Sequence, residues 1–299
     1  MLIPIPNAIK TRPGPAADGV RRLIASLGID PIVSYAIGDV RLRLPLSHEL
    51  PRIRARYPIY GTNQAAVANA LLQKYPDLSA IDIGANVGDT VAFWRGVGDF
   101  PVLAAEPSER YVRLLRLNSA ALGDVTIHPG LIGEVDVEAE MRIEERLGTA
   151  RAIAGDEPHR ITRLTSLVEE YPRFRGAKLL KIDTDGSDGE VISGGYDWIA
   201  TAKPAVFFEF SPFLANRSRQ PLMDAVAMLV SLGYGCLMFY DNVGEFALTV
   251  RAAESERIKE LHAHALAWGE ERYWDVAAFH DEDEDLAARL RLRELERPR

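Results

Sequence analysis

The sequence predicts an α/β fold in which a mostly parallel sheet carries helices on both faces. From residue 79 onward, short apolar runs alternate with amphipathic segments, which is typical of parallel strands joined by helical crossovers. A glycine-containing loop follows the first apolar run, as in a Rossmann-like sheet. The chain has 299 residues, of which 47% are hydrophobic, enough for one large domain with additions.

The order of these elements predicts a mostly parallel, seven-stranded sheet with an antiparallel C-terminal hairpin. The hairpin is expected at 237–250, because the stretch 241–244 has turn chemistry. The segments with strand character are 79–83, 101–105, 125–128, 178–183, 205–210, 235–240, 245–250 and 273–279. Helices are expected at 64–74, 88–95, 108–120, 163–170, 187–199, 220–232, 253–268 and 283–295.

The chain divides by pattern into two parts. Residues 1–57 are expected to form an N-terminal extension, and residues 58–299 the Rossmann-like domain. Within the extension, 20–27 has helical character, and 32–44 alternates in places between apolar and arginine side chains. This alternation predicts a β-hairpin that turns near Gly38.

The most informative stretch is the loop after the first core strand, which reads D-x-G-x-x-x-G from Asp82 to Gly88. Gly84 permits a tight turn and a close approach of the backbone to a ligand, and Gly88 lets the next helix sit near the strand. A dinucleotide loop reads G-x-G-x-x-G, but Ala85 and Asn86 stand in place of a second close glycine. The loop therefore favours a cofactor without a pyrophosphate, of which S-adenosylmethionine is the common one. Asp82 would organise the loop or reach the methionine amino group, and Gly84, Ala85 and Asn86 would lie along the methionine part.

A second acid stands where a ribose-binding residue is expected. The next strand ends in Glu106 and Pro107, about 20 residues after the glycine loop, where an acid takes the ribose hydroxyls in nucleotide-binding α/β folds. Its two carboxylate oxygens accept from two vicinal hydroxyls at once. Ser108 would cap the following helix, and Pro107 and Ser108 complete this side of the cofactor site. The competing interpretation is an ordinary turn with a solvated Glu106.

Carboxylates also follow two central strands. Asp183 and Asp185 come directly after an apolar strand, Gly186 turns the chain into a helix, and Glu209 lies near the end of the next strand. Ligands of open α/β sheets bind outside the carboxyl ends of the strands. We expect Asp183, Asp185 and Glu209 to supply the catalytic base, or to hold a metal ion such as Mg²⁺. Asp183 would also contact the cofactor.

With both stretches in view, the chain resembles the FkbM-type methyltransferases, which depend on S-adenosylmethionine. The resemblance covers roughly residues 58–250. It implies a class I methyltransferase fold and O-methyl transfer to a hydroxyl of a sugar, a glycan or a polyketide-derived natural product. The motifs that carry it are Ile81–Gly88, Glu106-Pro107 followed by Leu117-Asn118, Arg163–Leu167, Lys181–Gly186 and Lys203–Glu209.

The chain departs from the family pattern at two positions. Asp185 stands where the family usually has Glu, which keeps the charge and shortens the reach. Ser166 stands where the family commonly has an acid, which removes a carboxylate. Tyr60 and Asn63 precede the first core strand, where methyltransferases often close over the cofactor, and they join the cofactor set.

Histidines give weaker candidates. His128 ends the third strand and is an alternative base, although a lone histidine at a strand end is more often structural. His159 and Arg160 are expected in a loop that lines the acceptor site or is only structural.

Composition restricts the partners. The net charge of −8 disfavours a nucleic-acid binder, which normally has a basic excess. Cys236 is the only cysteine, so an intrachain disulfide is excluded. No apolar run approaches the roughly 20 residues that span a bilayer, and the first residues do not have the pattern of a signal peptide. We expect a cytoplasmic protein that acts on a small-molecule or glycan acceptor, with a homo-oligomer left open.

Two other functions compete with methyl transfer. A nicotinamide-dependent dehydrogenase needs the G-x-G-x-x-G loop that the chain lacks. A non-catalytic nucleotide-binding module predicts lost acids at the strand ends, yet Asp82, Glu106, Asp183 and Glu209 are all present.

Overall fold

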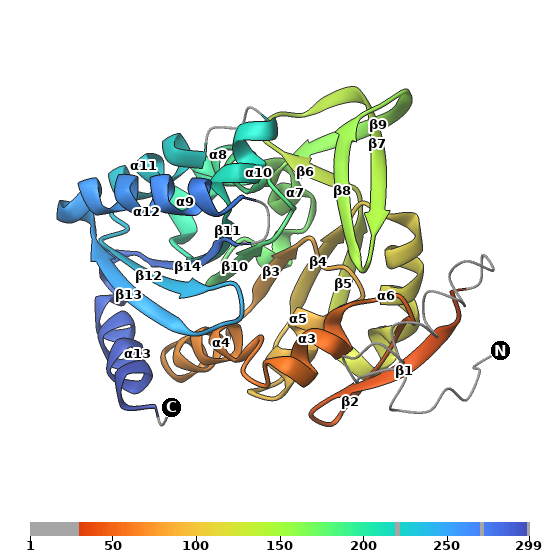
Figure 1. Ribbon diagram of the computed structural model, residues 1–299, viewed down its shortest axis with the longest axis horizontal. Coiled ribbons are helices and arrows are strands. Elements are labelled where there is room, and N and C mark those ends of the chain that lie inside the picture. Colours follow the sequence, from red (N-terminus) through yellow and green to blue (C-terminus); the bar gives the residue numbers. More distant parts are fainter. Residues whose placement is uncertain (1–29, 219–221, 270–271, 298–299) are drawn as a thin grey trace.

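An eight-stranded sheet runs through the centre of the computed structural model, which describes residues 30–218, 222–269 and 272–297 (Figure 1). The strand order is β13-β12-β14-β11-β10-β3-β4-β5. The five strands from β11 to β5 are parallel, whereas β14 is antiparallel to both its neighbours and β13 is antiparallel to β12. The predicted parallel sheet with its antiparallel C-terminal hairpin is confirmed, with one strand more than the expected seven. The bounds are β3 (Ala80–Ile83), β4 (Val102–Glu106), β5 (Val125–Pro129), β10 (Leu179–Ile182), β11 (Ala205–Phe210), β12 (Cys236–Asp241), β13 (Phe246–Arg251) and β14 (Trp274–Phe279).

Helices cover both faces of this sheet, as Figure 1 shows. One face carries α4 (Thr62–Lys74), α5 (Asp89–Arg95), α6 (Glu109–Leu122) and α13 (Glu284–Glu296). The other carries α7 (Leu164–Glu170), α8 (Asp188–Gly194), α9 (Tyr196–Ala202), α10 (Pro212–Ser218), α11 (Leu222–Ser231) and α12 (Ser255–Trp268). Short 3₁₀ helices lie at Pro172–Phe174, Ala252–Glu254 and Asp281–Asp283. The single helix expected at 187–199 is two helices that meet at Gly195. Each face has its own buried apolar cluster.

The N-terminal hairpin is present and packs onto the domain. Strands β1 (Ile32–Ile37) and β2 (Val40–Pro45) pair antiparallel around Gly38, as predicted. On β2, the Arg43 N–H donates to Asn118 Oδ1 of α6 at 2.7 Å, and Asn118 Nδ2 donates back to the Arg43 carbonyl at 3.0 Å. Helix α3 (Leu50–Arg56) follows. The helix predicted at 20–27 lies outside the described residues.

A second sheet was not predicted from the sequence. Strands β6 (Leu131–Gly133), β7 (Val137–Arg146), β8 (Thr149–Ala154) and β9 (Glu157–Arg163) form it in the order β6-β9-β7-β8. The long β7–β8 hairpin extends along one side of the main sheet toward α3 and α5 (Figure 1). None of its strand residues is buried, so the hydrophobic pattern that reveals core strands is weak here. His159 and Arg160, expected in a loop, lie in β9.

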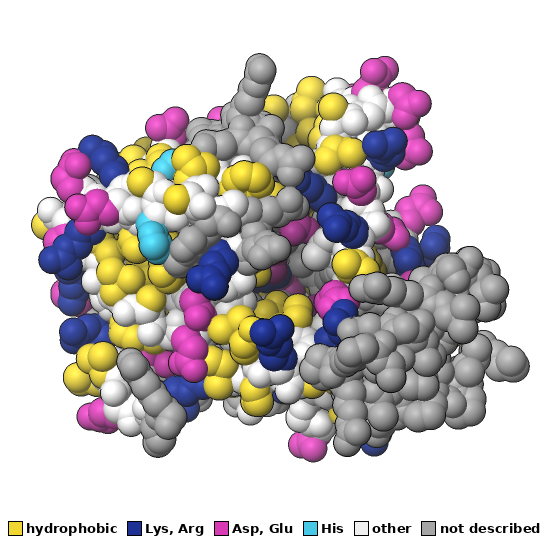
Figure 2. Space-filling view, in the orientation of Figure 1, with side chains coloured by type: hydrophobic (Ala, Val, Ile, Leu, Met, Phe, Trp, Pro, Cys, Tyr) yellow, Lys and Arg dark blue, Asp and Glu magenta, His cyan; other side chains and the backbone are white. Residues whose placement is uncertain are grey.

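Charged side chains of both signs share the visible surface. On the face shown in Figure 2, Lys and Arg side chains are interspersed with Asp and Glu rather than gathered into one stripe. In the described part of the chain, no helix combines the length and the apolar character needed to cross a membrane.

Close packing of two helices explains Gly88. Its φ is +89°, a backbone conformation that residues with a Cβ rarely adopt. A Cβ there would lie 2.4 Å from Leu122 Cδ1 and 2.9 Å from Leu115 Cδ1, both on α6. The glycine therefore lets the start of α5 pack tightly against α6.

We predict that Gly88→Ala lowers the unfolding free energy by about 1–3 kcal/mol, because it combines backbone strain with overpacking. Thermal unfolding followed by circular dichroism measures the change. The matched control is Gly176→Ala, since nothing lies within 4 Å of its added Cβ. A Gly88→Ala protein as stable as the wild type contradicts this account of the loop.

Candidate cofactor and active site

A buried ammonium group lies where β3 and β10 meet. The Nζ of Lys181 on β10 is 3.1 Å from Asp82 Oδ1 on the adjacent strand and 3.4 Å from Asp183 Oδ2. It also donates a hydrogen bond to the Gly84 carbonyl oxygen at 3.2 Å. Lys181 and Asp82 are register partners, and both are almost completely buried. A charge so far from water is tolerated when it is paired and hydrogen-bonded.

The two buried charges shift each other's pKa. Burial raises the pKa of Asp82 to about 6, although the Lys181 ammonium opposes that rise. Burial alone would lower the pKa of Lys181, but the carboxylates of Asp82, Asp183 and Asp89 raise it above its ordinary value. Lys181 therefore stays charged at neutral pH and holds the glycine loop against the end of β10.

Gly84 is required by a contact within the protein. Its φ is +80°, and a Cβ would lie 1.9 Å from the carbonyl oxygen of Asp183. The residue lets the loop after β3 touch the backbone at the end of β10. The close approach to a ligand that the sequence suggested is thus, in this structure, a close approach to Asp183.

Glu106 at the end of β4 is held by backbone amides. Its Oε2 accepts from the Asn86 N–H at 2.8 Å, and its Oε1 accepts from the Ser108 N–H at 2.9 Å. Only 2% of the residue is exposed, and burial raises its pKa to about 7 despite these hydrogen bonds. Each carboxylate oxygen has more than one acceptor site, so Glu106 retains capacity for two ligand hydroxyls.

A cavity of about 110 Å³ lies against these groups. Six of its lining residues belong to the predicted site: Tyr60, Gly84, Asn86, Glu106, Asp183 and Asp185. Lys181, Asp89 and His48 also line it and were not assigned a role from the sequence. The volume is below the roughly 300–1,000 Å³ typical of ligand sites, which indicates that the walls are drawn close together.

The other predicted cofactor residues do not line the cavity. Asp82 pairs with Lys181, and the Ala85 N–H donates to the Ala105 carbonyl oxygen at 3.0 Å. Asn63 is buried, and its Nδ2 donates to Asp275 Oδ2 at 3.2 Å. The Ser108 hydroxyl caps α6 by accepting from the Tyr111 N–H. Gly88 serves helix packing, and Pro107 lines a separate groove beside Pro129 and His159.

Two predicted catalytic residues lie away from the cavity. Glu209 on β11 is the register partner of Asp275 on β14 and is only 7% exposed. Burial, with the nearby Asp183 and Asp188 carboxylates, raises the pKa of Glu209 well above its ordinary value. His128 lies on the edge strand β5, with its Nδ1 3.3 Å from the Tyr171 hydroxyl. The structure therefore does not bring His128 to Asp183 and Asp185.

The predicted metal set is not supported. Within 30–218, 222–269 and 272–297, no group of three or more His, Cys, Asp and Glu side chains is arranged to hold a metal ion. Asp183, Asp185 and Glu209 follow neighbouring strands, but Glu209 is directed to a buried position beside Asp275 rather than to the cavity. We derive no metal-dependent step.

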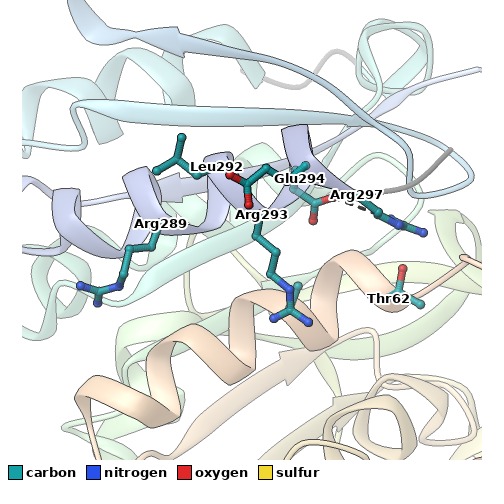
Figure 3. Close-up of a pocket in the computed structure, with 8 residues that line it drawn as sticks. Thr62, Arg289, Leu292, Arg293, Glu294 and Arg297 are labelled. Carbon is teal, nitrogen blue, oxygen red and sulfur yellow. Dashed lines mark ion pairs between the residues drawn. The ribbon is translucent and has the colours of Figure 1, made fainter.

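A larger groove lies elsewhere. It has a volume of about 650 Å³ and runs between α13 and the start of α4. Figure 3 shows that Arg293 points from α13 toward α4, whereas Arg289 points away along the helix surface. None of the carboxylates that end the parallel strands lines this groove, so the smaller cavity is the candidate site.

One residue to which the sequence analysis assigned no role could have been recognised from the sequence. Lys181 is a lysine within an otherwise apolar strand, Leu179–Ile182, and a charge in a buried strand demands a partner. His48 gave no comparable signal, because it comes from the extension and reaches the loop only through the fold.

We predict that Lys181→Met lowers the unfolding free energy by about 3–5 kcal/mol at pH 8, because Asp82 is left as an unpaired buried charge. With Lys181 present the pKa of Asp82 is about 6, and loss of the ammonium raises it further. The penalty therefore grows as pH rises above about 6, and it is small at lower pH, where Asp82 carries a proton in both proteins. Urea unfolding at pH 8 and pH 5 measures both effects.

The control for this prediction is Lys178→Met, three residues earlier in the sequence. Lys178 is half-buried, and its Nζ donates to the Ala202 carbonyl oxygen. Its effect should be smaller and independent of pH between 5 and 8. A Lys181→Met penalty that is the same at both pH values contradicts the pairing.

Residues 82–236, which include the glycine loop and the end of β10, match the model of the methyltransferase FkbM domain. No curated protein matches the chain.

Several solved methyltransferase structures are similar at low identity. A methyltransferase FkbM from Methylobacillus flagellatus KT is 15% identical with a TM-score of 0.38; the match covers 73% of this chain and 65% of that one, so the chain spans about two thirds of that structure. A precorrin-6y C5,15-methyltransferase from Geobacter metallireducens GS-15 is 13% identical with a TM-score of 0.40, over 73% and 87% of the two chains. An O-methyltransferase from Bacillus cereus in complex with SAH is 14% identical with a TM-score of 0.39, over 72% and 80%.

The family match extends over more than half of the 299 residues and contains the glycine loop, Glu106, Lys181, Asp183 and Asp185, which line the cavity. The chain therefore belongs to the FkbM methyltransferase family.

Proposed function

We propose that this protein is an S-adenosylmethionine-dependent O-methyltransferase that acts on a hydroxyl of a sugar, a glycan or a glycosylated or polyketide-type natural product. The observation that carries the proposal is the cavity between the glycine loop and the end of β10, which both Glu106 and Asp183 line. The FkbM family supports methyl transfer, and the sequence resemblance supports this class of acceptor.

The cavity has the chemistry that the cofactor requires. S-adenosylmethionine, when bound, supplies a methyl group on a positively charged sulfonium. Carboxylates of Asp89, Glu106, Asp183 and Asp185 line the cavity, and they favour a cation over an anion. The free acceptor sites of Glu106 suit the ribose hydroxyls, and the loop at Gly84–Asn86 suits the methionine part.

Asp183 is the proposed general base. Its side chain is 47% exposed and lines the cavity, so it is open to an acceptor while Lys181 holds one of its oxygens. As the acceptor oxygen forms its bond to the methyl carbon and the bond from carbon to sulfur breaks, Asp183 takes the hydroxyl proton. A positioned base contributes about 10²–10⁴-fold to such a step, and alignment of the hydroxyl contributes further.

Asp185 has a supporting role in this proposal. Burial and the neighbouring Asp183 and Asp188 carboxylates raise the pKa of Asp185, so it binds a proton more readily than an exposed aspartate. It is therefore suited to donate a hydrogen bond to the acceptor or to receive the proton from Asp183.

We predict that Glu106→Gln weakens binding of S-adenosylhomocysteine by about 10–100-fold, because charge-assisted hydrogen bonds to the ribose are lost. Isothermal titration calorimetry measures the affinity. Glu109→Gln on α6 is the control, since the Glu109 side chain is 93% exposed, and it should bind as the wild type does. Equal affinity in the Glu106 variant removes the ribose assignment.

We predict that Asp183→Asn lowers methyl transfer at least 100-fold with little change in cofactor affinity, because the amide cannot accept the proton. The assay is transfer of labelled methyl from S-adenosylmethionine to the best acceptor found for the wild type in a panel of sugars and glycosides. Asp77→Asn, an exposed position before β3, should retain full activity. Full activity of the Asp183 variant would exclude its role as base.

The competing functions make different predictions. A non-catalytic module would bind the cofactor but transfer no methyl group to any acceptor in the panel. A nicotinamide-dependent dehydrogenase would bind NAD in preference to S-adenosylhomocysteine.

A further inference from the structure

The tip of the β7–β8 hairpin closes over the glycine loop. We define this tip as Leu147–Thr149, the turn between β7 and β8. Leu147 and Gly148 have positive φ values of +52° and +106°, as expected for a tight two-residue hairpin turn. Figure 1 shows the hairpin descending from the second sheet toward α3 and α5. Gly148 and Thr149 line the cavity together with Lys181 on β10 and Asp183 just after it.

Three consecutive hydrogen bonds, from the Leu50 amide through His48 and Asn86 to the Gly148 carbonyl oxygen, hold the tip. The Leu50 N–H donates to His48 Nδ1 at 3.2 Å, so Nδ1 is the acceptor and Nε2 carries the proton of the neutral ring. His48 Nε2 therefore donates to Asn86 Oδ1 at 3.3 Å. The amide orientation of Asn86 is fixed in turn, and its Nδ2 donates to the Gly148 carbonyl oxygen.

Other contacts join the same segments. The Glu49 N–H donates to the Leu147 carbonyl oxygen at 3.0 Å. The His48 ring packs on Gly148, where an added Cβ would lie 2.8 Å from Nδ1. Burial lowers the pKa of His48 to about 4, which keeps the ring neutral and the chain of hydrogen bonds intact at pH 7. Asn86 thus uses both ends of its side chain within the protein.

The hairpin is only weakly anchored by apolar contacts, since Ala150 on β8 is a partly buried side chain that packs against the core. No residue of the β7 and β8 strands is buried, and segments with few buried apolar contacts open at low free-energy cost. Near the tip, the contacts that hold β7 to the domain are polar: Ser108 Oγ donates to Glu145 Oε1, and Arg110 lies 3.7 Å from Glu145 Oε2. The tip is therefore closed by a small set of polar interactions that can break together.

We propose that the hairpin tip, His48 and Asn86 form a latch over the cofactor cavity, and that cofactor enters or leaves only after the bond between Asn86 and Gly148 breaks. The inference rests on the proposed function, because it takes this cavity as the cofactor site. The closed tip explains why the cavity measures only about 110 Å³. It also assigns to Asn86 a closing role in place of the direct cofactor contact that its position in the loop suggested.

Stopped-flow measurement of S-adenosylhomocysteine binding to Gly148→Ala tests the latch. The added methyl group meets the His48 ring and strains a positive φ, which favours the open state. If opening limits both entry and exit, association and dissociation rates each rise about tenfold while Kd changes less than about threefold. Gly38→Ala is the matched control: it also changes a positive-φ glycine in a hairpin turn, but nothing lies within 4 Å of its Cβ.

Other outcomes overturn the proposal. Unchanged rates in Gly148→Ala show that the tip does not gate the cavity. A faster dissociation rate with an unchanged association rate shows an ordinary contact with bound cofactor. Wild-type protein that binds no S-adenosylhomocysteine removes the proposed function and the latch with it, whereas binding with wild-type rates in the variant removes the latch alone.

Hydrogen exchange on the wild-type chain provides a test without a substitution. The amide of Glu49, which bonds to Leu147, should exchange faster than the amides inside α4, and S-adenosylhomocysteine should slow it. Exchange of the Glu49 amide at the same rate with and without the bound ligand contradicts the latch.

Discussion

The site depends on one buried ammonium group. Lys181 contacts the Asp82 carboxylate of the neighbouring strand, the Asp183 carboxylate at the end of its own strand, and the carbonyl of Gly84 in the loop. These three contacts fix the loop, the floor of the cavity and the proposed base relative to one another. Because Asp82 and Lys181 are both almost fully buried, neither charge is tolerated without the other. The pair sets the geometry, and the residues that touch ligand are placed around it.

Function and stability conflict around this pair. Burial raises the pKa of Asp82 to about 6, of Glu106 to about 7 and of Asp275 to about 8. A raised carboxyl pKa means that ionisation is less favourable in the folded protein than in the unfolded chain. Each group therefore lowers stability as pH rises from its ordinary pKa of about 4 up to its raised value, and the loss is complete above that value. Of these groups, Glu106 lines the proposed cofactor cavity, and Asp82 lies next to it through its contact with Lys181.

The fold and the centre of the site were predicted from the sequence for physical reasons. Strands β3, β10 and β11 are buried on both faces, so they are mostly apolar runs, each with one charged residue, and are easy to recognise. Parallel strands end at one edge of the sheet, which is why Glu106 and Asp183 were both expected at the cofactor site. Glycines at 84 and 88 were recognised, but their neighbours in space, Asp183 and α6, appear only in the folded chain.

The parts of the fold and of the site that were not predicted from the sequence depend on contacts between distant segments or lack a hydrophobic pattern. The β7–β8 hairpin has no buried strand residue, and its charged, irregular alternation does not distinguish it from a surface loop. His48 and Gly148 lie far apart in sequence and meet only because the extension and the second sheet converge on the loop. Glu209 was placed at the correct sheet edge, but its burial beside Asp275 depends on β14, which joins the sheet from the C-terminal part of the chain.

The central claim is that the cavity between the glycine loop and the end of β10 binds S-adenosylmethionine. The most direct test is a crystal structure of the full chain grown with S-adenosylhomocysteine. The account predicts the ribose hydroxyls within hydrogen-bond distance of Glu106, the sulfur next to Asp183, and the Lys181 contacts unchanged. Ligand in the groove between α4 and α13, or a ribose that does not reach Glu106, would contradict it.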